Sequence, residues 1–231
     1  MNESMQTEYG QTLGGSLATR QQRVLRNTYW LLALSMVPTV LGAWVGVSTG
    51  IMASLGMGAS TLLFFVGAFG LMFLVEKTKN SSTGVVALLA FTFFMGLMLS
   101  RLIAAVPGFR NGSSLIMMAF GGTGAIFFAM ASLATVIKRD LSGMGKFLFV
   151  GAIILMVAGV ANIFLQSSAM MLTILVLAMA VFSAFMLYDI KRVIDGGETN
   201  YISATLAIYL DLYNVFQSLL SLLGIFGGER D

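Results

Sequence analysis

Between Thr28 and Val75 the chain carries no charged residue. About a quarter of the residues of a soluble domain are charged, so an uncharged stretch of this length does not suit a soluble fold. It is also too long for one membrane helix, because about 20 helical residues span the bilayer core. Glycine and serine residues over 48–60 interrupt it. The stretch therefore predicts two membrane-spanning helices, over residues 29–47 and 59–75.

More apolar runs follow, and each is bounded by charged or turn-forming residues. They predict further spans over residues 84–103, 115–137, 147–165, 169–188 and 201–226, and the sixth helix has room to continue to Ile194. The composition agrees with a membrane protein, since 58% of the residues are hydrophobic and only 10% are charged. The predicted fold class is an all-α integral membrane protein, a bundle of seven transmembrane helices.

The two ends of the chain differ from the rest. Residues 1–28 are largely polar and begin without apolar periodicity, which predicts a flexible tail. Residues 29–226 form the predicted seven-helix domain, and residues 227–231 a short C-terminal tail.

Three local motifs predict helix contacts and helix ends. Gly42 and Gly46 have the spacing that lets two membrane helices approach closely. The glycine pair at 196–197 is typical of the end of a helix. Thr199 or Asn200 can then cap the last helix.

Lysine and arginine residues are distributed unevenly between the predicted loops. Cytoplasmic loops of membrane proteins are enriched in these residues. With the N-terminus inside, the inner segments hold Arg20, Arg23, Arg26, Lys77, Lys79, Lys138, Arg139, Lys146, Lys191 and Arg192, and the outer side holds Arg101, Arg110 and Arg230. The N-terminal tail and the connection before the last helix are therefore predicted to be cytoplasmic.

The chain contains no cysteine and no histidine. This excludes disulfides, thiol catalysis and zinc sites built from these residues. The basic residues do not form a stripe with interleaved aromatic residues, so no nucleic-acid partner is predicted. We predict no resident cofactor, and carboxylates are left as the groups that could sense protons near neutral pH.

Two carboxylates lie in or beside the last two apolar runs. Asp211 is the only charged residue between Glu198 and Glu229, and Asp189 stands just before the connection to the last helix. A carboxylate is costly in lipid, so inside a membrane helix it generally marks a functional site with a partner. Asp189 and Asp211 are therefore the candidate functional pair.

If the two carboxylates meet, they would share one proton and titrate as a unit. Loss of that proton would leave two repelling charges that separate or recruit a cation, and calcium is a cation that carboxylate oxygens bind. Asp189 and Asp211 are thus a candidate pH sensor, ion gate and calcium-binding pair. At a rise of about 1.5 Å per residue, Asp211 lies about 15 Å from the start of the last helix and Asp189 about 8 Å from the end of the sixth helix at Ile194. The two side chains are thus at different depths, and contact between them requires a tilted last helix or a later start of that helix.

Polar residues follow Asp211 along one face of the last helix. Asn214, Ser218 and Ser221 come at helical steps of three and four residues. Such a stripe should point into the bundle or toward a water-filled cavity. A packing role stays open for Asn214, Ser218 and Ser221, because the same residue types join membrane helices by hydrogen bonds.

Two membrane aspartates also suggest an intramembrane aspartyl protease, whose dyad shares a proton. The usual intramembrane pattern has a glycine beside the second aspartate, whereas Leu210 and Leu212 flank Asp211. The chain is therefore not predicted to be an enzyme.

The motifs around the pair resemble those of a known family. Seven apolar helices, the sequence YDI at 188–190 and the sequence YLDLYNVFQSLLSLLG at 209–224 are similar to the Bax inhibitor-1 family of membrane proteins. The resemblance implies a central last helix and makes Asp189 and Asp211 the paired aspartates of a pH-sensitive calcium leak. In channel-like relatives a basic residue at the end of the second helix latches the pair, and Lys77 is the nearest match in the sequence EKTK found here.

Four further stretches resemble one bacterial branch of the family, which modulates the membrane AAA protease FtsH: VLRNTY at 24–29, GLMFL at 70–74, VANIFLQ at 160–166 and GGETNYI at 196–202. This resemblance implies a bacterial inner-membrane protein that binds an FtsH-like protease. It would act as a slow substrate or inhibitor, engaged through the N-terminal tail at 1–19. The alternative function is a pH-gated leak for calcium or another cation, controlled by Asp189 and Asp211.

Overall fold

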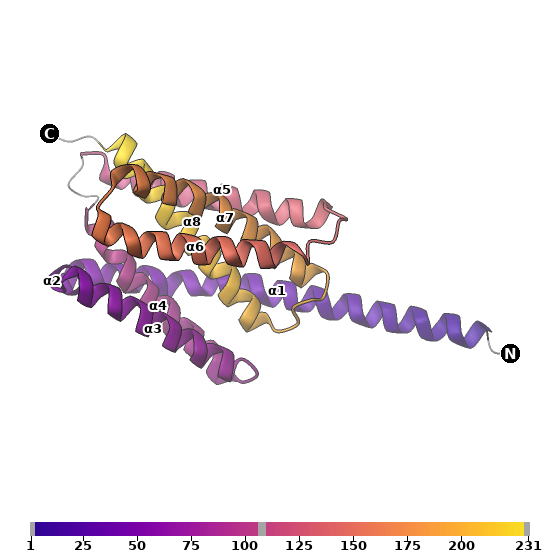
Figure 1. The fold of residues 1–231 in the computed structure, drawn as a ribbon. Coiled ribbons are helices and arrows are strands. Elements are labelled where there is room, and N and C mark those ends of the chain that lie inside the picture. Colours follow the sequence, from indigo (N-terminus) through magenta and orange to yellow (C-terminus); the bar gives the residue numbers. More distant parts are fainter. Residues whose placement is uncertain (1–2, 106–109, 229–231) are drawn as a thin grey trace.

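The computed structural model describes the backbone of residues 3–105 and 110–228 and, within those ranges, the side chains from Thr19 onward except that of Met57. Every regular element in this part of the chain is a helix (Figure 1). The helices are α1 (Glu3–Thr49), α2 (Ile51–Ser54), α3 (Met57–Thr78), α4 (Ser82–Ala105), α5 (Gly112–Val136), α6 (Met144–Leu165), α7 (Ser168–Ile194) and α8 (Tyr201–Gly227). Seven of them are long and apolar enough to cross a membrane, so the predicted seven-span α-helical fold is confirmed.

The first helix differs most from the sequence prediction. Its backbone is helical from Glu3 onward, and the stretch Thr19–Thr49 is long and apolar enough to contain a membrane span. Figure 1 shows this N-terminal part of α1 projecting beyond the other helices. The sequence predicts a flexible tail over 1–28, and a helical backbone does not by itself test flexibility, so the tail stays a prediction. The short C-terminal tail at 227–231 lies mostly outside the described residues.

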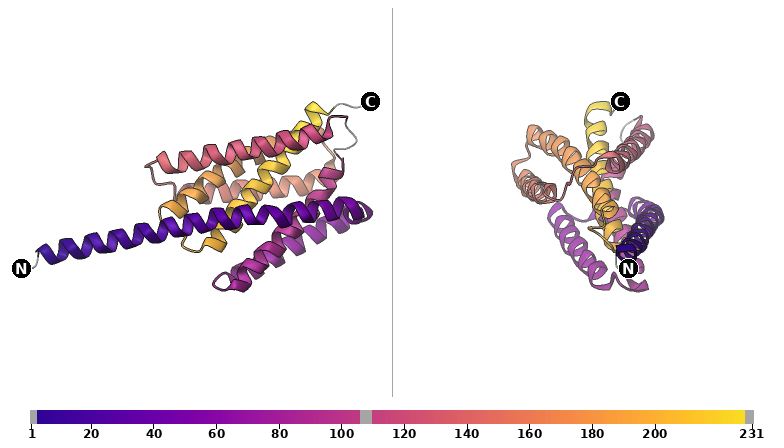
Figure 2. Two further views of the ribbon diagram at one scale, coloured as in Figure 1. Left: turned by 180° about the vertical axis from the view of Figure 1, so that it is seen from behind. Right: turned by 90° about the vertical axis from the view of Figure 1, so that its right-hand side faces the viewer.

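The last helix is the centre of the bundle, as predicted. Helix α8 contacts α1, α3, α4, α5 and α7. In the most hydrophobic 18-residue stretch of α8, 50% is buried inside the protein, whereas 6% of the equivalent stretch of α6 is buried. Figures 1 and 2 show α8 crossing the bundle obliquely, between the helices that surround it.

Tyr209 fixes α8 against two neighbouring helices. Its hydroxyl lies 2.9 Å from the Thr39 hydroxyl of α1 and donates to the carbonyl oxygen of Thr92 in α4 at 3.4 Å. Its ring packs edge to face on Phe91, with the ring centroids 6.0 Å apart. A buried phenol needs a hydrogen-bond partner, so these contacts determine how α8 is seated against α1 and α4.

Helices α1 and α4 pack at backbone contact. A Cβ atom on Gly42 would collide with the carbonyl oxygen of Phe93, and one on Gly96 would collide with the carbonyl oxygen of Thr39. Gly46 is packed in the same way against Ser100. Small residues permit such close approach between membrane helices, so the close contact predicted from Gly42 and Gly46 is confirmed.

The connection between α7 and α8 ends one helix and starts the next with local hydrogen bonds. Gly196 has a φ of 79°, in the left-handed region that glycine adopts without strain after a helix. The Asn200 side-chain oxygen accepts hydrogen bonds from the backbone N–H groups of Ile202 at 2.9 Å and Ser203 at 3.2 Å. Asn200 rather than Thr199 is therefore the cap of α8.

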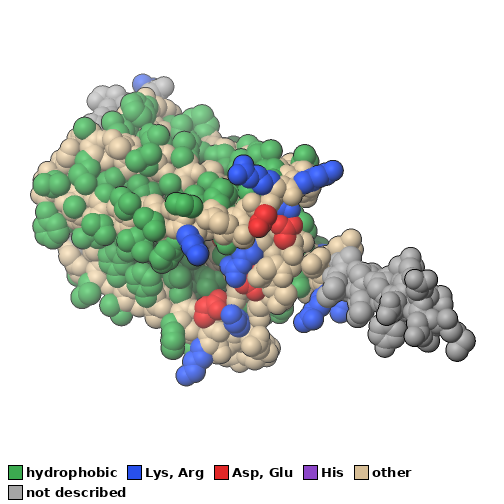
Figure 3. Space-filling view, turned by 45° about the vertical axis from the view of Figure 1, so that its right-hand side comes forward, with side chains coloured by type: hydrophobic (Ala, Val, Ile, Leu, Met, Phe, Trp, Pro, Cys, Tyr) green, Lys and Arg blue, Asp and Glu red, His purple; other side chains and the backbone are tan. Residues whose placement is uncertain are grey.

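Charged side chains gather at one end of the molecule. This end, called here the charged end, consists of the α3–α4 turn, the α5–α6 connection and the α7–α8 connection. Figure 3 shows Lys, Arg, Asp and Glu side chains together at this end, near the projecting part of α1, while hydrophobic side chains cover the rest of that face. Large hydrophobic residues such as Phe164, which is 83% exposed, would be unfavourable in water and suit contact with lipid. The chain is thus a multi-pass membrane protein.

The α1–α4 contact predicts a specific sensitivity to added methyl groups. We expect Gly42→Ala and Gly96→Ala each to destabilise the protein by about 1–3 kcal/mol, because the new methyl group meets backbone atoms that cannot move away cheaply. Gly70→Ala is the matched control, since a Cβ atom there has nothing within 4 Å. Thermal unfolding in detergent measures the difference. Equal unfolding temperatures for Gly42→Ala and Gly70→Ala would contradict the packing described here.

Candidate functional site

A cavity of about 340 Å³ opens at the charged end between α3, α7 and α8. Part of its wall is apolar, with Met72, Leu206 and Leu210 among the lining residues. The polar part of the wall consists of Glu76, Lys79, Asp189, Arg192, Glu198 and Ser203. A polar cavity that reaches a membrane carboxylate is the kind of place in which ions or protons can be handled.

The structure brings the two predicted aspartates together. Asp189 lines the cavity. Asp211 is only 4% exposed, and the two carboxyl groups lie within hydrogen-bonding range of each other. Because α7 ends at Ile194 and α8 begins at Tyr201, the oblique path of α8, and not a later start, makes this contact.

The contact between the two carboxyl groups has a chemical consequence. An ionised carboxylate has acceptors and no donor, so two ionised groups repel each other and cannot form a hydrogen bond. The second side-chain oxygen of Asp211 is buried and receives no hydrogen bond from any described residue. Contact between the two groups is thus compatible with a shared proton or with a cation between them, and both stay predictions. The Arg192 guanidinium lines the same cavity and is close enough to act on the charge of Asp189.

The structure does not bring Lys77 to the aspartate pair. Lys77 is exposed and is not among the residues that line the cavity. The basic residue of α3 and its turn that does line the cavity is Lys79, whose amine donates to the Glu76 carboxylate at 2.7 Å. This hydrogen bond raises the pKa of Lys79 above its ordinary value. Residues two apart on a helix lie on nearly opposite sides of it, so Lys79 reaches the cavity where Lys77 does not, and the latch assigned to Lys77 from the resemblance stays a prediction without a contact that supports it.

The polar face of α8 is only partly buried. Ser218 is buried, while Asn214 and Ser221 are half-buried. Asn214 donates to the carbonyl oxygen of Leu210 at 2.8 Å, and Ser221 donates to that of Gln217 at 2.8 Å, so both bind their own helix. These contacts give Asn214 and Ser221 no hydrogen bond to another helix, and a role in ion handling stays a prediction for all three residues.

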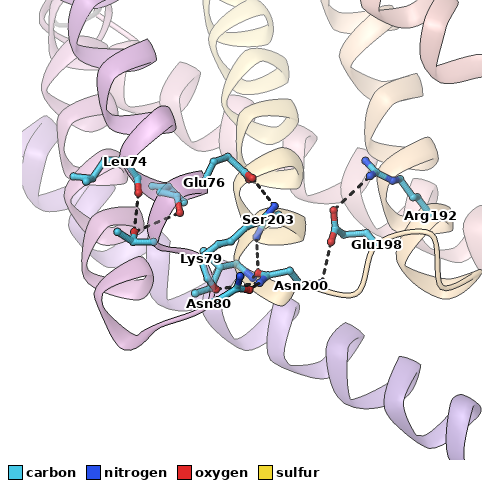
Figure 4. A network of polar contacts seen from close by, with 11 residues as sticks. Leu74, Glu76, Lys79, Asn80, Arg192, Glu198, Asn200 and Ser203 are labelled. Atoms are coloured by element: carbon cyan, nitrogen blue, oxygen red, sulfur yellow. Dashed lines mark hydrogen bonds and ion pairs between the residues drawn. The ribbon is translucent and has the colours of Figure 1, made fainter.

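A polar network beside the cavity joins the start of α8 to the α3–α4 turn (Figure 4). The Asn200 amide donates to the carbonyl oxygen of Lys79 at 3.0 Å and to the side-chain oxygen of Asn80 at 3.0 Å. The residue that caps α8 therefore also ties α8 to the α3–α4 turn. The sequence indicated the cap, but nothing in it indicated the second partner.

Glu198 lies in the α7–α8 connection and holds this connection against the end of α7 (Figure 4). Its carboxylate accepts from the backbone N–H of Asn200 at 2.9 Å and lies 3.5 Å from the Arg192 guanidinium. Glu198, Arg192 and Glu76 are thus residues of the site that the sequence analysis did not select. Arg192 and Glu198 follow Asp189 closely in the sequence, which is a signal that could have indicated them, whereas no such signal marks Glu76 at the end of α3.

The described residues contain no group of three or more His, Cys, Asp or Glu side chains arranged to hold a metal ion. Calcium takes about six to eight oxygen ligands. Asp189 and Asp211 could supply carboxylate oxygens, and backbone carbonyl groups or water would have to supply the rest. Calcium binding by Asp189 and Asp211 stays a prediction.

Comparison with known proteins assigns the family. Residues 21–228 match the family model described as "Inhibitor of apoptosis-promoting Bax1". The chain belongs to the Bax inhibitor-1 family. The resemblance seen in the motifs at 188–190 and 209–224 is thereby confirmed, and the match covers all seven membrane-spanning helices.

Bacterial members of the Bax inhibitor-1 family are similar to this chain over most of its length. It is 39% identical over 202 residues to the Modulator of FtsH protease YccA of Escherichia coli strain K12. The aligned residues make up 87% of this chain and 90% of that protein. The Inner membrane protein YccA of Escherichia coli O6:H1 gives the same values. An uncharacterized membrane protein of Vibrio cholerae is 40% identical over 207 residues, 88% of this chain and 89% of that protein. These names describe a modulator and membrane proteins, and they agree with the predicted multi-pass inner-membrane localisation.

The double role of Asn200 can be separated by substitution. We expect Asn200→Ala to lower the free energy of unfolding by about 1–2 kcal/mol through loss of the cap, with a further loss of about 1 kcal/mol from the bonds to the α3–α4 turn. Asn200→Asp keeps the acceptor that caps α8 but has no donor for Lys79 and Asn80, so it should lose only the second part. Thermal unfolding of both variants in detergent measures the two losses. An Asn200→Asp variant as stable as the parent would show that the link to the turn contributes nothing.

Proposed function

We propose that this protein modulates an FtsH-type membrane protease. The observation that carries the proposal is the 39% identity, over 87% of the chain, to a protein named as a modulator of FtsH protease. The match covers most of the chain and is not confined to one motif. We therefore expect this chain and that relative to present a similar surface to a protease of the same kind.

The arrangement of α1 suggests how modulation would work. The N-terminal part of α1 projects beyond the bundle and gives an ATP-driven protease a segment to grip (Figure 2). The membrane-spanning part of the same helix is packed at backbone contact on α4 through Gly42 and is tied to α8 through Thr39. Pulling on the N-terminus therefore works directly against the tightest helix contact of the bundle. Such a chain would be engaged easily and extracted slowly, which is how a slow substrate inhibits its protease.

Removal of the N-terminal segment tests this proposal. We expect deletion of residues 2–18, which leaves the membrane-spanning part of α1 from Thr19 onward, to abolish slowing of FtsH in a reconstituted assay. The assay follows degradation of a second membrane substrate with and without the full chain. A variant with the same residues in scrambled order is the matched control for length and composition, and it should retain the effect if the segment acts as a handle. Full modulation by the deletion variant would rule out engagement through this segment.

A second candidate function rests on the aspartate pair at the base of the cavity. We propose that Asp189 and Asp211 control a cation leak through the bundle. The support is geometric: Asp211 is buried in contact with Asp189, and Asp189 lines a polar cavity at the charged end. Ionisation of both carboxyl groups would place two negative charges in contact, and their repulsion would favour separation of α7 from α8 or entry of a cation.

The leak predicts a pH-dependent flux. Calcium flux into proteoliposomes containing the intact chain should rise from mildly acidic to mildly alkaline pH, because the shared proton is lost as pH increases. We expect Asp211→Asn to remove this pH dependence, since the amide cannot ionise. Glu8→Gln, which removes one negative charge from the N-terminal segment, serves as the control and should behave like the parent. No flux above empty liposomes from folded protein would reject the leak and leave the protease proposal untouched.

A further inference from the structure

A second cavity lies at the charged end beside the first. It has a volume of about 220 Å³ and lies between the α5–α6 connection and the C-terminal end of α7. Its polar wall consists of Asp140, Ser142, Tyr188, Lys191, Arg192 and Asp195. Neither function proposed above uses this cavity.

Lys191 is the buried cation of the second cavity. It is only 8% exposed, and its amine donates to the Asp195 carboxylate at 2.6 Å. An ammonium group carries three donors, and within the described chain its amine makes this single hydrogen bond. Buried donors in proteins generally find acceptors. Lys191 is therefore prepared to bind an acceptor that enters the cavity.

The two carboxylates of the wall already have donors from the protein itself. Asp140 accepts from the backbone N–H of Ser142 at 2.8 Å and from its hydroxyl at 2.9 Å, and these bonds hold the pKa of Asp140 below its ordinary value. Asp195 is bound by Lys191. The hydrogen-bonding capacity that remains in the wall is therefore mostly donor capacity, on Lys191, Arg192 and the Tyr188 hydroxyl.

The rim of this cavity adds positive charge. Lys138, Arg139 and Lys146 flank the part of the α5–α6 connection that lines the cavity, and all three are exposed. None of them belongs to an ion pair within the described residues. Figure 3 shows Lys and Arg side chains gathered at this end of the molecule. Basic residues that lie where membrane helices leave the bilayer attract anionic lipid headgroups.

We propose that this second cavity binds the phosphate group of an anionic phospholipid from the surrounding leaflet. Lys191 and Arg192 donate to the phosphate oxygens, and the three exposed basic residues of the rim increase the local concentration of anionic lipid. Pockets for drug-sized ligands measure about 300–1,000 Å³, so this smaller cavity suits a headgroup whose acyl chains stay in the bilayer. Phe147, which lies on the first turn of α6 and is 80% exposed, belongs to the apolar surface that this part of the bundle offers to lipid chains.

Native mass spectrometry of the full chain in detergent tests the proposal with two lipids, phosphatidylglycerol and phosphatidylethanolamine. We expect retention of the anionic phosphatidylglycerol, and a loss of affinity of about fivefold for each basic residue removed, as in Lys191→Gln. The matched control is Arg101→Gln. Arg101 is exposed on α4 away from the charged end, where it donates to Ser60 at 3.1 Å, so its removal should leave retention unchanged.

Two further variants keep the test valid if Lys191→Gln folds poorly. Lys191→Gln combined with Asp195→Asn removes both members of the buried ion pair, so no carboxylate is left without its donor. Lys138→Gln with Arg139→Gln and Lys146→Gln changes only exposed side chains. Both should weaken retention of phosphatidylglycerol.

Three results would overturn the proposal. Equal retention of phosphatidylethanolamine would show that negative charge is not recognised. Unchanged retention in the variants that lack Lys191 would place the lipid elsewhere. Inorganic phosphate that raises the unfolding temperature as much as phosphatidylglycerol does would show that a free anion, and not a lipid, is the ligand. These readouts do not depend on protease modulation or on ion flux.

Discussion

Asp211 stands in the middle of an apolar membrane helix, and a carboxylate in that position cannot face lipid without a large cost in free energy. The helix that carries it must therefore be surrounded by protein. In the structure α8 contacts α1, α3, α4, α5 and α7, and Asp211 is 4% exposed. The arrangement of the remaining helices follows from this requirement, because they supply the walls around α8. The partner of Asp211 follows as well, since Asp189 of α7 faces it at the base of a polar cavity.

The bundle is held together in two different ways along its length. In its interior, α1 and α4 touch at their backbones through Gly42 and Gly96, and Tyr209 bonds α8 to both. At the charged end, Asn200 bonds the start of α8 to the α3–α4 turn, while the partly exposed ion pairs are local, Lys79–Glu76 at the end of α3 and Arg192–Glu198 between α7 and the connection that follows it. Exposed ion pairs contribute only about 0–1 kcal/mol each. The charged end is therefore where the helices can separate at the smallest cost, and this is the end at which both cavities lie.

Arg192 connects the features found at that end. It lines both cavities, is paired with Glu198, and acts on the charge of Asp189. A ligand that binds Arg192 in the second cavity would change the charge that Asp189 experiences in the first. Protease modulation, in contrast, is proposed to act through the projecting end of α1 and through the resistance of the α1–α4 contact. The two activities would thus depend on different parts of one bundle, and each can be changed without the other.

The seven spans could be predicted from the amino-acid sequence, because the thickness of a bilayer sets the length of each apolar run, and the same runs showed that Asp189 and Asp211 are the residues most costly to place there. It also indicated the glycine contact at Gly42 and the cap of α8 at Asn200, since both depend on short-range geometry. That the aspartates touch could not be predicted, because the contact results from the oblique path of α8, and packing against helices far away in the chain sets that path. The same holds for the basic residue near the pair, where the sequence pointed to Lys77 and the structure has Lys79 at the cavity. A shift of two residues moves a side chain to the opposite face of a helix, and no pattern within one segment shows which face a distant helix will meet.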